Sequence, residues 1–178
     1  GSVGLISQSG SIVIGLLADC RRFGWSRAVS TGNEAVIVAA DVLEYLIDDP
    51  ATRTIAMFLE TVRQPERFVA ALDHAADRGK PVVVLKVGRS ERARHAITSH
   101  TGGLAGESRV IEAVLRAHRA IEVHDMDEMT ETLAACQAAR RPAGRRIAVV
   151  TNSGGHTELI LDVAASVGLE LPPLSPAT

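Results

Sequence analysis

Aromatic residues are scarce in this 178-residue chain, at 3% of the sequence, although 46% of its residues are hydrophobic. A core with so few rings has to be built from Val, Ile, Leu and Ala. Such a core is typical of buried parallel strands flanked by Ala-rich helices. The same scarcity argues against an electron-transfer flavodoxin, because flavin rings are usually sandwiched between aromatic side chains.

Cysteines, charge imbalance and long apolar runs are also scarce. The only two cysteines, Cys20 and Cys136, form no metal-spaced pair, which predicts free thiols in a reducing compartment, a cytoplasmic protein and no metal site. A formal net charge of −2 gives no electrostatic reason to expect nucleic acid. We expect no membrane contact either, because no apolar run approaches a spanning length and no signal peptide is visible.

Short apolar runs alternate with segments whose apolar residues recur at helical spacing. The runs that predict buried strands are Val3–Ser7, Arg27–Ser30, Thr54–Leu59, Pro81–Lys86 and Ala120–Val123. The helical patterns cover Ile12–Phe23, Val36–Ile47, Glu66–Arg78, Gly106–His118 and Met126–Arg140. This alternation predicts an α/β fold with helices on both faces of a parallel sheet. A turn at 142–144 predicts a boundary between domains at 1–140 and 145–178.

An internal repeat is the most informative feature of the sequence. Val3–Ser11 matches Ile147–Gly155 position by position, and the register continues without a gap to Gly24 and Gly168. Each copy predicts a strand, a hydroxyl–amide–Ser–Gly turn, and a helix closed by a glycine. Only about ten residues follow the second helix, too few for the other strands of a sheet. We therefore expect a second, truncated unit that is completed elsewhere in a longer protein.

The two repeated turns, Ser9-Gly10-Ser11 and Ser153-Gly154-Gly155, are candidate phosphate sites. A small turn between a buried strand and a helix presents free backbone N–H groups beside the positive end of the helix dipole. Either turn taken alone is explained equally well as a simple helix cap. The duplication favours binding, because two positive helix ends are then available to one phosphate.

A segment rich in Ser, Thr and Gly, from Gly88 to Gly106, predicts a loop that contains His100. A neutral imidazole nitrogen can attack phosphorus, and a loop can carry the product between two sites, although most surface histidines have no such role. Glu60 follows a predicted buried strand, at the edge where ligands gather in parallel sheets. Its carboxylate either points into solvent or holds His100 and stabilises the charge that grows on phosphorylation.

Taken together and in this order, these elements resemble the succinyl-CoA synthetase superfamily, and most of all its nucleoside-diphosphate-forming acyl-CoA synthetase branch. The matching stretches are Val3–Gly10, Val29–Glu34, Leu59–Thr61, Val82–Arg89, Ser99–Gly106 and Ile147–Gly155. The resemblance implies a flavodoxin-like three-layer parallel sheet and the start of a second flavodoxin-like domain. One departure is Gly154-Gly155-His156-Thr157, where the family often has Gly-Gly-Pro-Gly.

The resemblance also implies the chemistry. His100 takes the phosphoryl group from an acyl phosphate, Glu60 steadies His100, and the turns at 9–11 and 153–155 hold the phosphate. Acyl-CoA and phosphate are the implied substrates, with CoA, ATP or ADP, and Mg²⁺ serving the full-length protein. The CoA-binding and ATP-grasp domains of the family are missing from this chain, so we expect the isolated fragment to be inactive.

Three alternatives stay open at this point. The first is a ligand-sensing or scaffolding module of a larger acyl-CoA-binding protein or protein acetyltransferase, although such relatives lack the working histidine that His100 matches. The second is the electron-transfer flavodoxin, which the scarce rings disfavour. The third is an assembly interface, in which helix-rich faces dock the missing domains or a second copy in a homodimer. Phosphate incorporation at His100 separates the synthetase from the first alternative, and a colourless purified protein would settle the second.

Overall fold

The computed structural model describes residues 1–19, 22–101, 108–138, 142–173 and 175, and for residues 19, 100, 101 and 108 it describes the backbone alone. The chain divides into two compact units, Gly1–Ala138 and Ala139–Thr178. Each unit has its own secondary structure and is considered by itself below.

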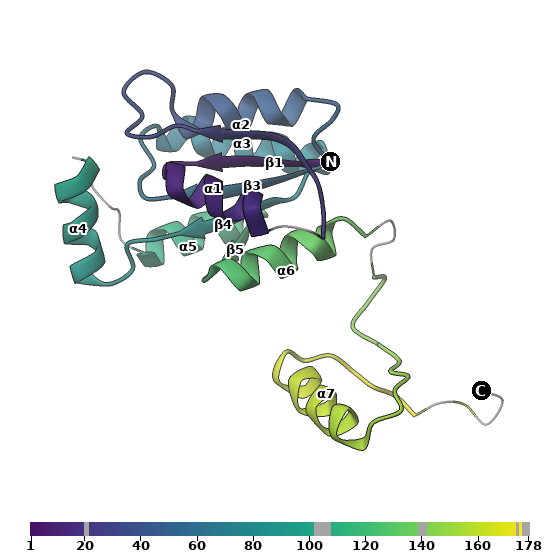
Figure 1. The fold of residues 1–178 in the computed structure, drawn as a ribbon. Coiled ribbons are helices and arrows are strands. Elements are labelled where there is room, and N and C mark those ends of the chain that lie inside the picture. The colour runs from purple at the N-terminus through teal and green to yellow at the C-terminus, as the bar shows by residue number, and fades with distance from the viewer. Residues whose placement is uncertain (20–21, 102–107, 139–141, 174, 176–178) are drawn as a thin grey trace. The chain divides into compact units, whose positions relative to one another are not determined.

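The first unit is built on a five-stranded parallel sheet with the strand order β2-β1-β3-β4-β5 (Figure 1). The strands are β1 (Val3–Ser7), β2 (Trp25–Ser30), β3 (Thr54–Leu59), β4 (Val82–Lys86) and β5 (Ile121–Val123). This is the flavodoxin order, in which the chain moves outward from β1 to β2 and then returns past β1 to β3. The predicted flavodoxin-like α/β fold is therefore confirmed.

Helices cover both faces of this sheet (Figure 1). One face is covered by α2 (Ala39–Asp48), α3 (Pro65–Asp77) and α5 (Ser108–Ala117), and the other by α1 (Gly10–Asp19) and α6 (Met126–Cys136). A further helix, α4 (Glu91–Thr101), packs on neither face. Alternate residues of β3 face opposite layers. Ile55, Met57 and Leu59 pack with α2, α3 and α5, whereas Ala56 and Phe58 pack with α1 and α6. A strand buried on both faces in this way reads as one continuous apolar run in the sequence.

The prediction of a loop from Gly88 to Gly106 is wrong for the central part of this segment, which forms α4. The Thr98 hydroxyl donates to the Arg94 carbonyl (3.1 Å), and the Ser99 hydroxyl donates to the His95 carbonyl (3.0 Å). Bonds of this kind, to carbonyls four residues earlier, satisfy Ser and Thr side chains within a helix. Hydroxyl-rich composition is therefore compatible with the helix here. Residues 102–107, with the glycines after His100, lie outside the described ranges.

The second unit contains α7 (Gly154–Ser166) and one isolated parallel bridge between Arg146 and Glu170. Gly168 closes α7 with a φ of +67°, as the repeat predicts for a helix-ending glycine. The strand predicted over Ile147–Thr151 does not form, and Val150 is 99% exposed. Among the described residues of this unit, no strand pairs with this segment beyond the single bridge at Arg146, so a hydrogen-bonded sheet does not form.

Gly24 was predicted to close the first helix in the way that Gly168 closes the second, and this prediction is wrong. Helix α1 is described as far as Asp19, residues 22–24 are not helical, and Gly24 lies just before β2. The Gly24 carbonyl accepts the backbone N–H groups of Ser2 (2.9 Å) and Val3 (3.2 Å). Gly24 therefore joins the starts of β1 and β2, and the repeat is closest in the turn, not at the helix end.

None of the helices within the described ranges combines the length and the apolar character that crossing a membrane requires.

Gly4 lies within β1 where α2 packs on the sheet. An added Cβ would lie 2.8 Å from Leu46 Cδ1 and 3.0 Å from Thr52 Cγ2, and both side chains are buried. We expect Gly4→Ala to lower the free energy of unfolding by about 1–3 kcal/mol because of this crowding. Gly15→Ala is the matched control, since Gly15 is exposed on α1 with open space around it. It should raise that free energy by about 0.5–1 kcal/mol. Urea unfolding compares the two, and a neutral Gly4→Ala would contradict the packing.

Candidate functional site

The carboxyl ends of β1 and β3 lie side by side at the point where the strand order reverses. Ligands of open parallel sheets bind outside the carboxyl ends of the strands at such a point. The turn Ser9–Ser11 follows β1, and Glu60 follows β3. The fold thus brings two elements of the predicted site, about fifty residues apart in sequence, to neighbouring strand ends.

The turn after β1 is shaped by serine hydroxyls. Ser7 Oγ accepts the Ser9 backbone N–H (3.1 Å) and donates to the Ser9 carbonyl (2.8 Å). Ser9 Oγ lies 3.0 Å from Ser11 Oγ, and both Gly10 and Ser11 are exposed. The first turn of α1 contains no acidic residue. An anion at this turn would therefore meet two hydroxyls and the positive end of α1 without an opposing charge from that turn.

The turn of the second copy uses the same first hydrogen bond. Thr151 Oγ1 accepts the Ser153 backbone N–H at 3.2 Å, just as Ser7 does for Ser9. Ser153 Oγ then accepts the backbone N–H of His156 (3.3 Å), so Ser153 is the N-cap of α7. Gly154 and Gly155 are exposed, and nothing would meet a Cβ added at either one. Because the two turns belong to separate units, a phosphate shared between them stays a prediction.

The main chain of Glu60 is held from both neighbouring strands. Gln8 Oε1 accepts the N–H groups of Glu60 (2.6 Å) and Thr61 (2.9 Å), and Gln8 Nε2 donates to the Thr61 carbonyl (2.9 Å). On the other side, Lys86 Nζ donates to the carbonyls of Glu60 (2.8 Å) and Val87. Gln8 is 7% exposed and Lys86 is 5% exposed. The position of Glu60 is therefore fixed by two buried polar side chains.

Lys86 carries its charge in a buried position at the end of β4. Burial is the largest influence and lowers the pKa of Lys86, while the nearby Glu60 raises it and Arg89 lowers it. A lysine whose pKa is lower in the folded than in the unfolded protein costs stability while it is protonated in both states. This cost disappears as the pH rises from the lowered pKa to the ordinary one. The protonated form of Lys86 therefore costs stability that the neutral form does not.

His100 is the residue on which the predicted chemistry depends. Its backbone lies in the last turn of α4, and its side chain lies outside the described part of the chain. Figure 1 shows α4 beyond the carboxyl ends of the strands, at the edge of the sheet from which Glu60 and the Ser9–Ser11 turn extend. A contact between His100 and Glu60 stays a prediction.

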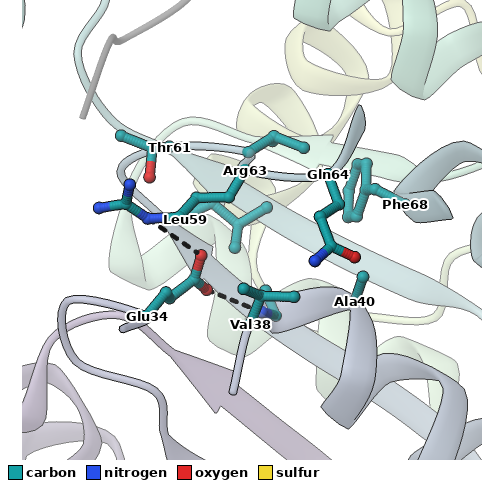
Figure 2. Close-up of a pocket in the computed structure, with 10 residues that line it drawn as sticks. Glu34, Val38, Ala40, Leu59, Thr61, Arg63, Gln64 and Phe68 are labelled. Carbon is teal, nitrogen blue, oxygen red and sulfur yellow. Dashed lines mark hydrogen bonds and ion pairs between the residues drawn. The ribbon is translucent and has the colours of Figure 1, made fainter. Parts of the chain in front are cut away.

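A small pocket beside this edge is lined by residues of the β2–α2 and β3–α3 connections (Figure 2). Glu34 is central to it, with a φ of +54° and a side chain that is 2% exposed. Its Oε1 accepts the backbone N–H of Ala39 (2.7 Å) at the start of α2 and the hydroxyl of Thr31 (3.2 Å). Its Oε2 lies 4.0 Å from Nε of Arg63. Glu34 therefore orders the start of α2 and links the two connections.

Sequence reasoning missed the roles of Gln8, Lys86 and Glu34. Two signals were present: Gln8 is the amide of the repeated turn, and Lys86 is the one charged residue in the run Val82–Lys86. A charged residue at the end of a strand with four apolar residues before it is a candidate for a buried functional charge. Glu34 ends the matching stretch Val29–Glu34, but its role was missed because it depends on a backbone conformation that non-glycine residues rarely adopt.

Comparison with known proteins finds similar sequences within larger proteins that are named as CoA ligases or synthases. Residues 1–136 match the family model described as succinyl-CoA ligase like flavodoxin domain. The alpha subunit of ADP-forming acetate–CoA ligase I from Pyrococcus furiosus is 36% identical over 173 residues, covering 96% of this chain and 37% of that protein. A trans-feruloyl-CoA synthase from an unknown prokaryotic organism is 35% identical over 172 residues, covering 96% of this chain and 24% of that protein.

Solved structures agree with these relatives. The dinucleotide forming acetyl-coenzyme A synthetase 1 of Ca. Korarchaeum cryptofilum, in complex with phosphate and ADP, superposes with a TM-score of 0.87 at 31% sequence identity. The match covers 97% of this chain and 38% of that one. The chain spans between 24% and 39% of the length of the curated relatives it matches.

Proposed function

Because the chain belongs to the succinyl-CoA ligase-like flavodoxin domain family, we propose that it is the central part of a nucleoside-diphosphate-forming acyl-CoA synthetase in which His100 carries the phosphoryl group. The observation that supports this most is the adjacency of the Ser9–Ser11 turn and Glu60 at the carboxyl ends of β1 and β3. The relatives named as ADP-forming ligases support the same reaction class.

The proposed reaction has three steps. Inorganic phosphate attacks the acyl carbon of acyl-CoA, the C–S bond breaks, and CoA leaves as the thiol. A ring nitrogen of His100 then attacks phosphorus of the acyl phosphate, and the P–O bond to the acyl group breaks to release the carboxylic acid. Finally, a terminal oxygen of ADP attacks the phosphohistidine, the P–N bond breaks, and ATP is released while the ring returns to its starting state.

The residues of this chain have distinct roles in that scheme. Glu60 accepts the N–H of the second ring nitrogen of His100, which fixes the tautomer and balances the positive charge that grows on the ring. The hydroxyls and backbone N–H groups of the turns at 9–11 and 153–155 hold the phosphoryl oxygens at two helix N-termini. In this scheme Mg²⁺ enters with the nucleotide, as the family resemblance implies.

The remaining chemistry needs parts beyond these residues. We infer that a CoA-binding part and an ATP-grasp part, on the same chain or on another subunit, supply the CoA and nucleotide sites, and that this chain alone has no synthetase activity. The P. furiosus relative is named as an alpha subunit. Assembly into a homodimer and a cytoplasmic location belong to the same proposal.

Incubation of the full-length protein with ATP labelled in the γ-phosphate, in the presence of Mg²⁺, tests this function. We expect protein-bound label that is labile in acid and stable in base, as for a phosphorus–nitrogen bond, and that unlabelled ADP removes. ATP labelled in the α-phosphate is the control and should transfer nothing. A full-length protein that takes up no label would contradict the synthetase and favour a ligand-sensing module.

A further inference from the structure

Both main-chain polar groups of Glu60 are bound by buried side chains, one from each strand that flanks β3. Gln8, directly after β1, accepts the Glu60 N–H at 2.6 Å. Lys86, the last residue of β4, donates to the Glu60 carbonyl at 2.8 Å. Because β1 and β4 are the hydrogen-bonded neighbours of β3, the main chain of Glu60 is held from both sides at the carboxyl end of β3. We call Gln8 and Lys86 the Glu60 clamp.

The Glu60 clamp does more than a stable sheet needs. The four residues before Lys86 in β4 are apolar and buried, so the strand is anchored without a charge at its end. Burial lowers the pKa of Lys86, so its protonated form costs stability that the neutral form does not. What points to a role in the chemistry is the contact of this buried lysine with the main chain of a candidate catalytic carboxylate.

A lysine and a glutamine also lie at the opposite end of the same sheet, near the amino ends of β3 and β4. Lys80, just before β4, donates through Nζ to the carbonyls of Leu46 (3.1 Å) and Asp49 (2.8 Å), and burial lowers its pKa as well. Gln137 donates through Nε2 to Thr54 Oγ1 (3.0 Å), where β3 begins. Lys80, like Lys86, donates to two main-chain carbonyls, whereas Gln137 binds a side-chain hydroxyl and serves as a glutamine of the same size. Both lie at the end of the sheet where no phosphate is expected.

We propose that Gln8 and Lys86 are positioning residues for phosphoryl transfer, because they hold the Glu60 main chain at the edge of the sheet from which the Ser9–Ser11 turn also extends, and so orient its carboxylate. The inference rests on the proposed function, in which Glu60 orients His100. A shift of about 1 Å in a group that positions a reactant costs about 10²-fold in rate. Loss of one bond of the Glu60 clamp should therefore reduce phosphoryl transfer far more than it reduces stability.

Four variants of the full-length protein test the clamp. Lys86→Met and Gln8→Asn are the test variants, and Lys80→Met and Gln137→Asn are their controls at the opposite edge. Rapid-quench labelling with γ-labelled ATP gives the rate of phosphohistidine formation and the KM for ATP, and urea unfolding gives the stability of each variant. We expect the rate to fall about 10²-fold in both test variants with KM unchanged, and to stay within about threefold of wild type in both controls.

A rescue experiment separates positioning from a general loss of structure. Lys86→Ala leaves space for the missing part of the lysine side chain, and n-propylammonium has the length and charge to fill it. We expect n-propylammonium to raise the labelling rate of Lys86→Ala at least tenfold. We expect 1-propanol, which has a similar size but no charge, to leave that rate unchanged. Equal effects of the two compounds would mean that Lys86 acts through packing, and the proposal would be wrong.

The outcomes of these experiments distinguish the clamp from the proposed function. Absence of label from the wild-type protein would overturn the function and the clamp together. Normal labelling of wild type, with Lys86→Met and Gln8→Asn no slower than Lys80→Met and Gln137→Asn, would overturn the clamp alone. Slow labelling in all four variants, in proportion to their lost stability, would also overturn the clamp.

Discussion

The His100→Asn variant of the full-length protein should take up no acid-labile label from γ-labelled ATP. Asparagine keeps a polar side chain, but its amide nitrogen is not basic enough to attack phosphorus, so the covalent intermediate cannot form. The backbone of residue 100 lies in the last turn of α4, at the negative end of the helix dipole, which favours the positive charge that develops on a histidine there. We therefore expect synthetase turnover to be lost along with the label.

His95→Asn is the matched control for this result. His95 lies on the same helix, one and a half turns earlier, and is exposed. Its replacement changes the same residue type in the same element, so labelling should stay within about twofold of wild type. Label that persists in His100→Asn would show that the phosphorylated residue lies elsewhere and would contradict the proposed mechanism.

Glu60→Gln has the second largest expected effect. Loss of the carboxylate that orients a catalytic histidine costs about 10⁴-fold in the serine-protease triad, so we expect labelling to slow by about 10²–10⁴-fold. The hydrogen bonds to Gln8 and Lys86 use the main chain of Glu60 and survive the substitution. Urea unfolding should consequently change little while the rapid-quench rate collapses, and the label that does form slowly should still be acid-labile.

Glu66→Gln serves as the control for Glu60→Gln. Glu66 is an exposed carboxylate in the first turn of α3, six residues farther along the chain. The substitution Glu66→Gln removes the same charge from a nearby exposed position and leaves the Glu60 clamp intact. It should therefore leave the labelling rate unchanged. If both glutamine variants slowed labelling equally, the effect of Glu60 would be one of net charge and not of a specific contact with His100.

The sheet of the first unit could be predicted from sequence because its central strands are buried on both faces. The expected bounds of β1 and β3 agree with the structure residue for residue. Short, nearly continuous apolar runs of this kind are typical of strands that are buried on both faces. The predicted ends of the helices differ from the observed ends by a few residues, because helix ends depend on capping interactions and not on apolar spacing. The strand over Ile147–Thr151 failed for a different reason, since a strand exists only with a partner.

The candidate site was predictable only in part. The adjacency of Glu60 and the Ser9–Ser11 turn could be predicted because parallel strands bring residues at their carboxyl ends to one edge. Gln8 and Lys86 were missed because their importance lies in which backbone groups they reach, and those bonds join residues 26 and 52 positions apart. Helix α4 was missed because Ser and Thr bond back to earlier carbonyls within a helix, an arrangement that composition alone cannot distinguish from a loop.

The position of the phosphate on the labelled full-length protein tests the central claim most directly. The protein is phosphorylated with ATP, digested at alkaline pH to preserve the phosphorus–nitrogen bond, and sequenced by mass spectrometry with fragmentation that leaves this bond intact. We predict phosphate on the imidazole of His100 in the peptide that contains the end of α4. Phosphate on another residue, such as His156 or Ser11, with none on His100, would contradict it.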